Sequence, residues 1–184
     1  IGHGLGSTPK WIIIKKLDNT GDWIVYHSET GANKYLFLNR NDAETSVTNI
    51  WSSVGSSTFN LISGYNDYNQ SGQKYIAYCW AEVSDFSKFG TYSGTGSAQT
   101  ITTGFAPDFV ITKRTNSTDN WRMYDSVRQN AQPFDEVLYP NDNAGEDDNT
   151  TGITGTTTTG FTLGTGNLSN NNGDTYIFIA FKMN

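Results

Sequence analysis

The hydrophobic positions of this chain fall in short bursts that are separated by turns. The first burst, residues 11–16, begins with one aromatic and three β-branched residues, and residues 23–27 form a second burst after a polar turn at 18–21. Two such bursts around a turn rich in Asp, Asn and Gly are typical of a β-hairpin. The same arrangement returns at 109–114 and 121–125. The pattern therefore predicts antiparallel strands that begin with two hairpins.

Further strands are expected along the rest of the chain, where helical periodicity is almost absent. Their expected ranges are 34–39, 58–62, 74–83, 87–93, 99–103, 136–139, 160–163 and 175–182. Many short strands with turn-rich connections favour an all-β fold. We expect a two-sheet antiparallel β-sandwich of jelly-roll or concanavalin-like type, and two small tandem sandwiches are the alternative.

The pattern is also repeated within the chain. Residues 10–16 return as residues 108–114, 98 positions later, and Trp23 returns as Trp121 at the same spacing. A fixed spacing that drifts by only a few residues along half the chain indicates internal duplication. What recurs is strand-forming residues, tryptophans and turns, which favours a structural or adhesive module.

The repeat defines the expected domain organisation. Residues 1–184 are interpreted as a single β-sandwich module made of two repeats, about 1–93 and 94–184. The segment 89–96 leads into the second copy and has no counterpart before Ile1. We therefore expect this module to be part of a longer protein in which a preceding module supplies that segment.

Charge and length exclude several kinds of partner. The chain of 184 residues has a net charge of −6 and no run of basic residues, which argues against nucleic acid as a partner. Its apolar bursts are far shorter than the roughly 20 residues that cross a membrane, so no membrane insertion is expected. Cys79 is the single cysteine, which excludes an intramolecular disulfide and suits a small buried residue.

Several phrases of the sequence, in their order along the chain, resemble a known family. They lie at residues 4–15, 75–83, 87–90, 104–111 and 124–128, and include Gly-Phe-Ala-Pro-Asp-Phe-Val-Ile and Tyr-Asp-Ser-Val-Arg. The chain resembles an uncharacterised repeat domain of large virion proteins from tailed phages, many of them marine. Proteins regarded as tail fibres are among them.

The resemblance implies a setting for the chain. It implies a viral protein on the surface of a phage particle, or otherwise outside the cell. The implied partners are other virion or fibre subunits in a multimeric assembly. It assigns no catalytic residues, because the family pattern contains none.

An acidic loop is the candidate metal site. The loop 141–149 contains four acids, Asp142, Glu146, Asp147 and Asp148. Carboxylate oxygens are ligands that calcium prefers, although Gly145 stands where an EF-hand loop needs a ligand. The loop is interpreted either as a solvated surface loop or as a Ca²⁺ site, and no other cofactor is expected.

Four aromatic residues lie beside Asn, Asp and Gly in sequence that resembles loops and do not recur in the repeat. They are Trp51, Tyr65, Tyr68 and Tyr92. Flat aromatic rings flanked by amides and carboxylates suit the faces of sugar rings, and loops on a rigid scaffold often carry binding sites. These residues are the predicted glycan-binding set, and the alternative is that the rings fill gaps beneath loops.

Catalysis is not expected. A glycoside hydrolase needs two carboxyl groups about 5–10 Å apart, and the acids here lie mostly in or beside turns. His27 is replaced by Asp125 in the second copy, so no histidine role is repeated. The chain is interpreted as a non-enzymatic tail-fibre or appendage module with a structural role or a lectin-like adhesion role. The alternatives are a secreted carbohydrate-binding module or glycan-active enzyme, and a capsid decoration or assembly protein.

Overall fold

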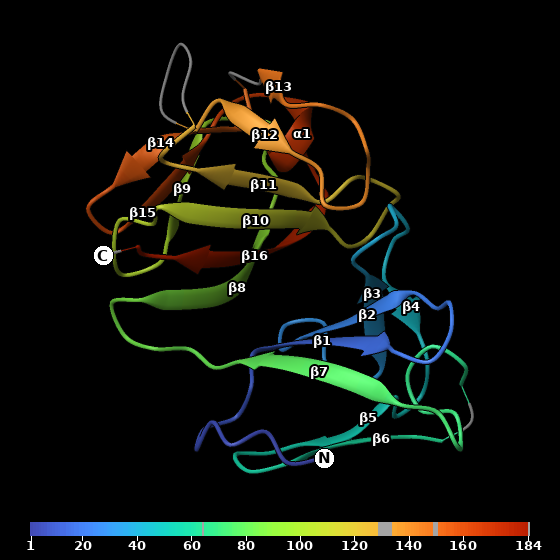
Figure 1. Cartoon of the computed structure of the whole chain (residues 1–184). Helices are drawn as coiled ribbons and strands as arrows, with labels where there is room; N and C mark the ends of the chain where they lie inside the picture. The colour runs from blue at the N-terminus through green and yellow to red at the C-terminus, as the bar shows by residue number, and fades with distance from the viewer. Residues whose placement is uncertain (64, 129–133, 149–150, 184) are drawn as a thin grey trace. The chain divides into compact units, whose positions relative to one another are not determined.

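The structure, a computed structural model, describes residues 1–63, 65–128, 134–148 and 151–183. Its strands form several antiparallel sheets, which confirms the expected all-β class. The chain divides into two compact units, the N-terminal unit Ile1–Glu82 and the C-terminal unit Val83–Asn184. Each sheet lies within one unit (Figure 1).

The N-terminal unit contains a five-stranded sheet in the order β4-β3-β2-β1-β7 and a separate hairpin, β5-β6. The strands are β1 (Trp11–Lys16), β2 (Trp23–His27), β3 (Lys34–Phe37), β4 (Thr45–Ser46), β5 (Trp51–Val54), β6 (Phe59–Leu61) and β7 (Tyr75–Trp80). β1 lies between β2 and β7, where Ile13 is opposite Val25 and Tyr78. The expected hairpin of 11–16 and 23–27 is therefore present, and β7 and β4 are the two edge strands of this sheet among the described residues.

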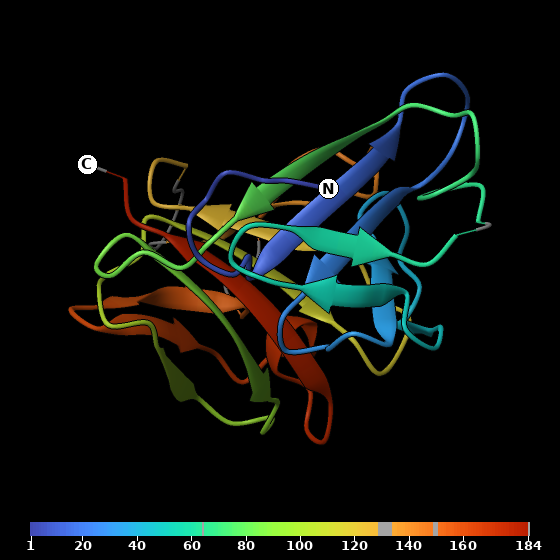
Figure 2. The same cartoon turned by 90° about the horizontal axis from the view of Figure 1, so that it is seen from below.

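The β5-β6 hairpin covers one face of this sheet. Ile12 and Ile14 of β1 pack in one buried cluster with Trp51 of β5 and Phe59 of β6. Figure 2 shows the hairpin in front of β1 and β2. Alternate residues of a strand point to the same face, so the apolar side chains at 12 and 14 need a cover of this kind.

The C-terminal unit is built from a six-stranded sheet in the order β13-β12-β11-β10-β16-β8 and a three-stranded sheet in the order β14-β15-β9. The first comprises β8 (Ser87–Ser93), β10 (Phe109–Arg114), β11 (Arg122–Asp125), β12 (Glu136–Leu138), β13 (Asp147–Asp148) and β16 (Thr175–Phe181). The second comprises β9 (Gln99–Thr102), β14 (Ile153–Thr157) and β15 (Gly160–Leu163), and a short helix α1 spans Asn167–Asn170.

Both sheets of the C-terminal unit contribute to one core. Val110 and Phe178 of the larger sheet pack in a buried cluster with Ile101 and Phe161 of the smaller one. The rings of Phe161 and Phe178 meet edge to face, with centroids 5.5 Å apart. Two sheets that share a core in this way form the layered arrangement expected of a β-sandwich.

The two units order their strands alike. The order β3-β2-β1-β7 of the N-terminal unit corresponds to β12-β11-β10-β16 of the C-terminal unit. The register also agrees, because Trp11 lies opposite Trp80 as Phe109 lies opposite Phe181. The C-terminal unit adds β8, which pairs with β16, and β9, which pairs with β15.

Four strands were missing from the sequence-based expectation: the two-residue strands β4 and β13, and the longer strands β5 and β14. β5 and β14 have the sequences WSSV and ITGTT, which are too rich in Ser, Thr and Gly to stand out as strands. Trp51 was expected in a loop, and that placement is wrong, because Trp51 begins β5 and is fully buried. Within the described residues, no helix has the length and apolar character needed to cross a membrane.

Replacing Trp51 by Ala is expected to lower the free energy of unfolding by about 3–5 kcal/mol, because it leaves a cavity under the hairpin. The half-exposed Tyr78 provides the control, since Tyr78→Ala removes an aromatic ring that is 44% exposed and should cost less than about 1 kcal/mol. Thermal unfolding followed by circular dichroism compares the two variants. An unchanged melting temperature for Trp51→Ala would contradict the placement of this ring in the core.

Asp174 makes the stability of the C-terminal unit depend on pH. Its carboxylate accepts hydrogen bonds from Asn171 Nδ2, from Arg114 Nη1 at 2.9 Å and from Asn116 Nδ2 at 3.2 Å. The bond from Asn171 is the main cause that lowers the pKa of Asp174, burial opposes it, and Arg114 lowers it further. A lowered folded-state pKa adds stability above the unfolded pKa, and this stability is lost as pH falls towards the folded pKa.

Asp174→Asn is therefore expected to destabilise the protein by about 1–2 kcal/mol at neutral pH. The difference from the natural sequence should shrink as pH falls below about 4, where the unfolded carboxyl group is protonated. Denaturant unfolding at several pH values measures this difference. Asp142→Asn is the matched control, because the exposed Asp142 carboxylate accepts one bond, from Ala144 N at 3.0 Å, and a similar loss there would refute the argument.

Candidate functional site

Two of the four predicted glycan-binding aromatics belong to the framework. The Trp51 ring is fully buried, and its Nε1 donates to Lys34 O at 3.0 Å. Tyr92 is 8% exposed and stacks on Tyr176 with centroids 5.0 Å apart, while its hydroxyl donates to Ser169 O at 2.7 Å. Neither ring presents a face to a ligand in solution in this structure.

The other two aromatics are brought together in the loop that follows β6. Tyr65 is 47% exposed, and its ring stacks on that of Tyr68 with centroids 5.1 Å apart and an interplanar angle of 19°. Tyr68 is only 3% exposed and belongs to the core cluster of the N-terminal unit. An exposed ring thus rests on a buried one, which fixes its orientation.

The stack continues into the sheet. The Tyr68 ring lies 6.2 Å from that of Tyr35 on β3, and Tyr35 meets Phe37 edge to face at 5.1 Å. Tyr65 is therefore the outer end of a row of four rings anchored on β3. Rows of this kind hold an aromatic side chain at low cost in conformational entropy, because the rings have few rotatable bonds.

Two amide side chains of the same loop, those of Asn66 and Gln70, are held by one lysine. Lys16 Nζ of β1 donates to Asn66 Oδ1 at 2.7 Å and to Gln70 Oε1 at 2.9 Å. The lysine is 4% exposed, whereas both amide residues are exposed. Lys16 bonds to the oxygen of each carboxamide. The nitrogen of each carboxamide is therefore the atom that can donate a hydrogen bond to a ligand.

The loop itself is held by hydrogen bonds between side chains and main-chain atoms. Tyr75 Oη donates to Asn66 O at 2.7 Å, and Gln70 N donates back to Tyr75 Oη at 3.1 Å. Asn69 Nδ2 donates to Leu61 O at 3.3 Å and to Ile62 O at 3.0 Å. These bonds tie both ends of the loop to β6 and β7, so its side chains are preorganised.

The Tyr68 hydroxyl has an unusual environment. Burial raises the pKa of Tyr68 well above its ordinary value, and the neighbouring Tyr65 and Tyr35 add to the shift. Its oxygen is buried and has no hydrogen-bond partner among the described residues. A buried hydroxyl without a partner is unfavourable, so a ligand or water that reaches it gains a bond the protein does not supply.

Together these groups form a candidate binding surface, and the carboxylate of Asp67 lies close to Tyr68. We name Tyr65, Tyr68, Asn66 and Gln70 the Tyr65 platform. It combines an exposed ring face with two amide donors, and the buried Lys16 beneath it is engaged with the amides. An apolar ring face beside amide groups matches the chemistry of a sugar, which has C–H faces and hydroxyl edges.

The acids of the predicted calcium loop are engaged with protein groups. Glu146 accepts a bond from Arg128 Nη1, and Asp147 accepts one from Tyr139 Oη at 2.7 Å. Asp142 accepts from Ala144 N at 3.0 Å, and Asp148 lies in β13, opposite Glu136. The predicted loop extends to Asn149, which lies outside the described residues.

The acidic loop does not form a metal cluster in the described structure. In residues 1–63, 65–128, 134–148 and 151–183 there is no group of three or more His, Cys, Asp or Glu that could hold a metal ion. The structure brings these acids to one edge of the larger sheet in the C-terminal unit without directing them at one point. Calcium binding stays a prediction that the geometry does not support.

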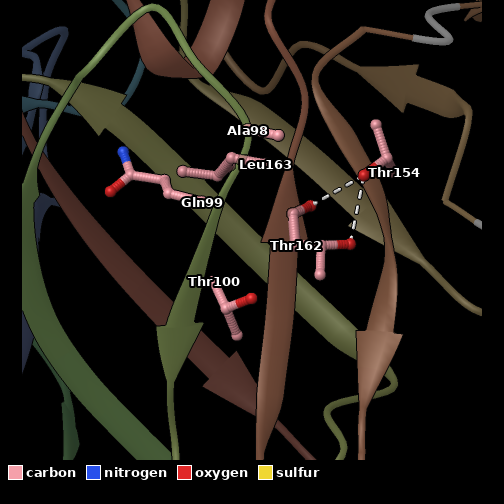
Figure 3. A pocket seen from close by; sticks show the side chains of 6 residues that line it. All are labelled: Ala98, Gln99, Thr100, Thr154, Thr162 and Leu163. Carbon is pink, nitrogen blue, oxygen red and sulfur yellow. Dashed lines mark hydrogen bonds between the residues drawn. The ribbon is translucent and has the colours of Figure 1, made fainter.

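The C-terminal unit has a pocket that the sequence did not indicate. It lies on the three-stranded sheet, and Figure 3 shows the six side chains that line it. They are Ala98, Gln99, Thr100, Thr154, Thr162 and Leu163. Threonine is common in β-strands, so the sequence pattern does not distinguish the threonines of this pocket from those of any other strand.

The pocket lining is polar but not ionisable. Thr154 Oγ1 lies 3.1 Å from Thr162 Oγ1 (Figure 3). Thr162 Oγ1 also donates to Gly155 O at 3.1 Å. Gln99 Nε2 donates to Asn170 Oδ1 at 2.6 Å. None of the six side chains can act as a general acid or base at neutral pH, so this pocket offers no catalytic group.

Sequence reasoning also missed two supports of the Tyr65 platform. Lys16 was counted as part of a strand end, although its Nζ joins β1 to the loop. Tyr35 was expected in a strand without a role in the site. Both contacts join residues more than 30 positions apart, and nothing in a single sequence indicates such pairs.

Comparison with known proteins gives the chain a family. The family model described as "Domain of unknown function (DUF7483)" matches residues 1–184. No curated protein matches the chain, and no solved structure does. The match extends over the whole sequence, and the chain therefore belongs to the family of this domain of unknown function, DUF7483.

Proposed function

We propose that this chain is a non-enzymatic binding module that recognises a glycan through the Tyr65 platform. The observation that carries the proposal is the exposed Tyr65 ring, stacked on the buried Tyr68 ring in a loop whose two exposed amide side chains are held by Lys16. Lectin-like sites use such rings because sugar C–H faces pack on them while hydroxyl groups bond to amides. One platform of this size binds weakly, and many copies on one particle raise the overall avidity.

The proposed setting is a tailed-phage particle, where the module lies in a tail fibre or another surface appendage. Support comes from the resemblance of residues 4–15, 75–83 and 104–111 to repeat domains of phage virion proteins. The partners are other fibre subunits and a glycan on the host surface. A secreted carbohydrate-binding module uses the same platform, and only the source of the glycan distinguishes it.

A duplication is proposed as the origin of the two units. It is supported by the sequence spacing of about 98 to 102 residues and by the shared strand order and register. Duplicated copies need not keep a binding site in both. The residues of the platform have no aromatic counterparts in the second copy, so binding is assigned to the N-terminal unit alone. The jelly-roll or concanavalin-like subtype stays a prediction.

A glycan array probed with the multivalent full chain tests the function. Tyr65→Ala should weaken binding to the recognised glycan by about tenfold or more, because truncating a central aromatic anchor removes much of the binding energy. The melting temperature should change little, since the ring is about half exposed.

Phe86→Ala is the matched control, because Phe86 is 44% exposed and lies in the C-terminal unit. It should bind as the natural chain does. Equal loss in both variants, or no binding of the folded chain to any glycan, would count against the proposal. The array is repeated in a calcium chelator, where binding should persist, and cleavage of a bound glycan would favour the glycan-active enzyme instead.

A further inference from the structure

β7 is an edge strand without the features that usually protect an edge. In the described residues it pairs with β1 on one side and with no strand on the other. Its sequence, YIAYCW, has no charged residue and no proline. Proteins usually protect such edges with Lys, Pro or a bulge, because exposed N–H and C=O groups recruit other strands.

The backbone groups on the open side of β7 are set by the pairing with β1. Leu17 N donates to Lys74 O at 2.9 Å, which fixes the alternation along the strand. In antiparallel pairs, alternate residues direct both backbone groups to the same neighbour. Tyr75, Ala77 and Cys79 therefore direct their N–H and C=O groups away from β1.

The equivalent edge in the C-terminal unit is covered. Thr115 N donates to Thr175 O at 2.9 Å, which matches the bond between Leu17 and Lys74. On the far side of β16, β8 pairs along seven residues, and Tyr176 lies opposite Tyr92.

Burial differs accordingly between the two strands. Tyr176 and Ala180 of β16 are both 0% exposed, whereas their counterparts Tyr75 and Cys79 are only partly buried. In the described residues, β7 thus has the pairing edge that β16 has, but no strand corresponding to β8 lies beside it.

We propose that the open edge of β7 binds an extended segment of about seven residues as an added antiparallel strand. The proposal does not depend on the Tyr65 platform. Main-chain bonds to Tyr75, Ala77 and Cys79 supply the affinity, as in other cases of strand addition, and side-chain pockets supply the specificity.

The side chains of β7 define what the segment carries. Opposite Tyr75 it has an aromatic residue, since Tyr92 stacks on the equivalent Tyr176 with an interplanar angle of 6°. Opposite Ala77 the added segment can have a residue larger than glycine. In the C-terminal unit the residue opposite Phe178 is Gly90, where a Cβ would lie only 2.6 Å from the Phe178 ring. In the N-terminal unit Ala77 stands where the C-terminal unit has Phe178, which leaves room for a side chain of the added segment.

A peptide of residues 87–93 that carries Gly90→Val is the probe, labelled with fluorescein and added to the full chain. Fluorescence anisotropy should show binding about tenfold tighter than that of the unchanged peptide, because the added isopropyl group is buried against Ala77. Hydrogen exchange should slow at the amides of Tyr75, Ala77 and Cys79. Alkylation of Cys79, the single cysteine, should slow as well.

Two controls separate strand addition from unspecific adhesion. The same peptide methylated on the amide nitrogen of residue 90 loses a donor that the pairing needs and should not bind. Ala77→Pro in the chain removes an amide that faces away from β1, so the sheet should persist while binding is lost. If this variant fails to fold, the methylated peptide still tests whether binding requires main-chain pairing with β7.

Three results would overturn the proposal. One is the absence of binding by the Gly90→Val peptide to the folded chain. Another is equal binding of the methylated peptide. The third is protection at β16 instead of β7, which would mean that the peptide only exchanges with β8. Self-association of the chain that Ala77→Pro abolishes and the peptide does not compete with would assign the edge to a second copy instead.

Discussion

The burial of one face of the β1–β2–β7 sheet under the β5-β6 hairpin is the constraint on which the N-terminal unit depends. Ile12 and Ile14 lie on that face, and Trp51 and Phe59 close it from the hairpin side. A small sheet with one apolar face open to water does not fold by itself, so the hairpin is as necessary as the strands it covers. The loop that carries Tyr65 follows directly from β6, and its position is a result of this packing.

The same constraint is met in the C-terminal unit with more material. There the cover has three strands, and Ile101 of β9 joins Phe161 of β15 in the core. In the N-terminal unit, the main chain of Ile1 takes the corresponding pairing position, since Phe59 N donates to Ile1 O at 3.0 Å, but the Ile1 side chain is 58% exposed and does not join the core. The two units therefore solve one packing problem with equivalent strands, and they differ in how completely the sheet edges are paired.

The sequence predicted the long strands well and the site only in part. β1, β2 and β10 have the predicted bounds because each begins with an uninterrupted run of β-branched and aromatic residues, and β8 also has its predicted bounds although its run is interrupted by Gly90. β5 was missed because only Trp51 in it is strongly apolar, and the burial of that ring depends on a sheet that comes earlier in the chain.

The four aromatics illustrate the same limit. Composition alone does not separate Trp51 from Tyr65, since both lie beside polar residues. Contacts with residues distant in the sequence bury Trp51, whereas Tyr65 stays about half exposed. Such contacts cannot be predicted from the pattern of a single sequence.

Tyr75 joins two features that are otherwise separate. Its backbone lies in the open edge strand, and its hydroxyl bonds to Asn66 and Gln70 in the loop that carries the Tyr65 ring. A reduction in the conformational freedom of β7 would therefore also reduce the number of conformations accessible to that loop. If both proposals hold, order gained along β7 would lower the conformational entropy that the loop loses on binding a ligand, and the Tyr75 phenol group would couple the two sites.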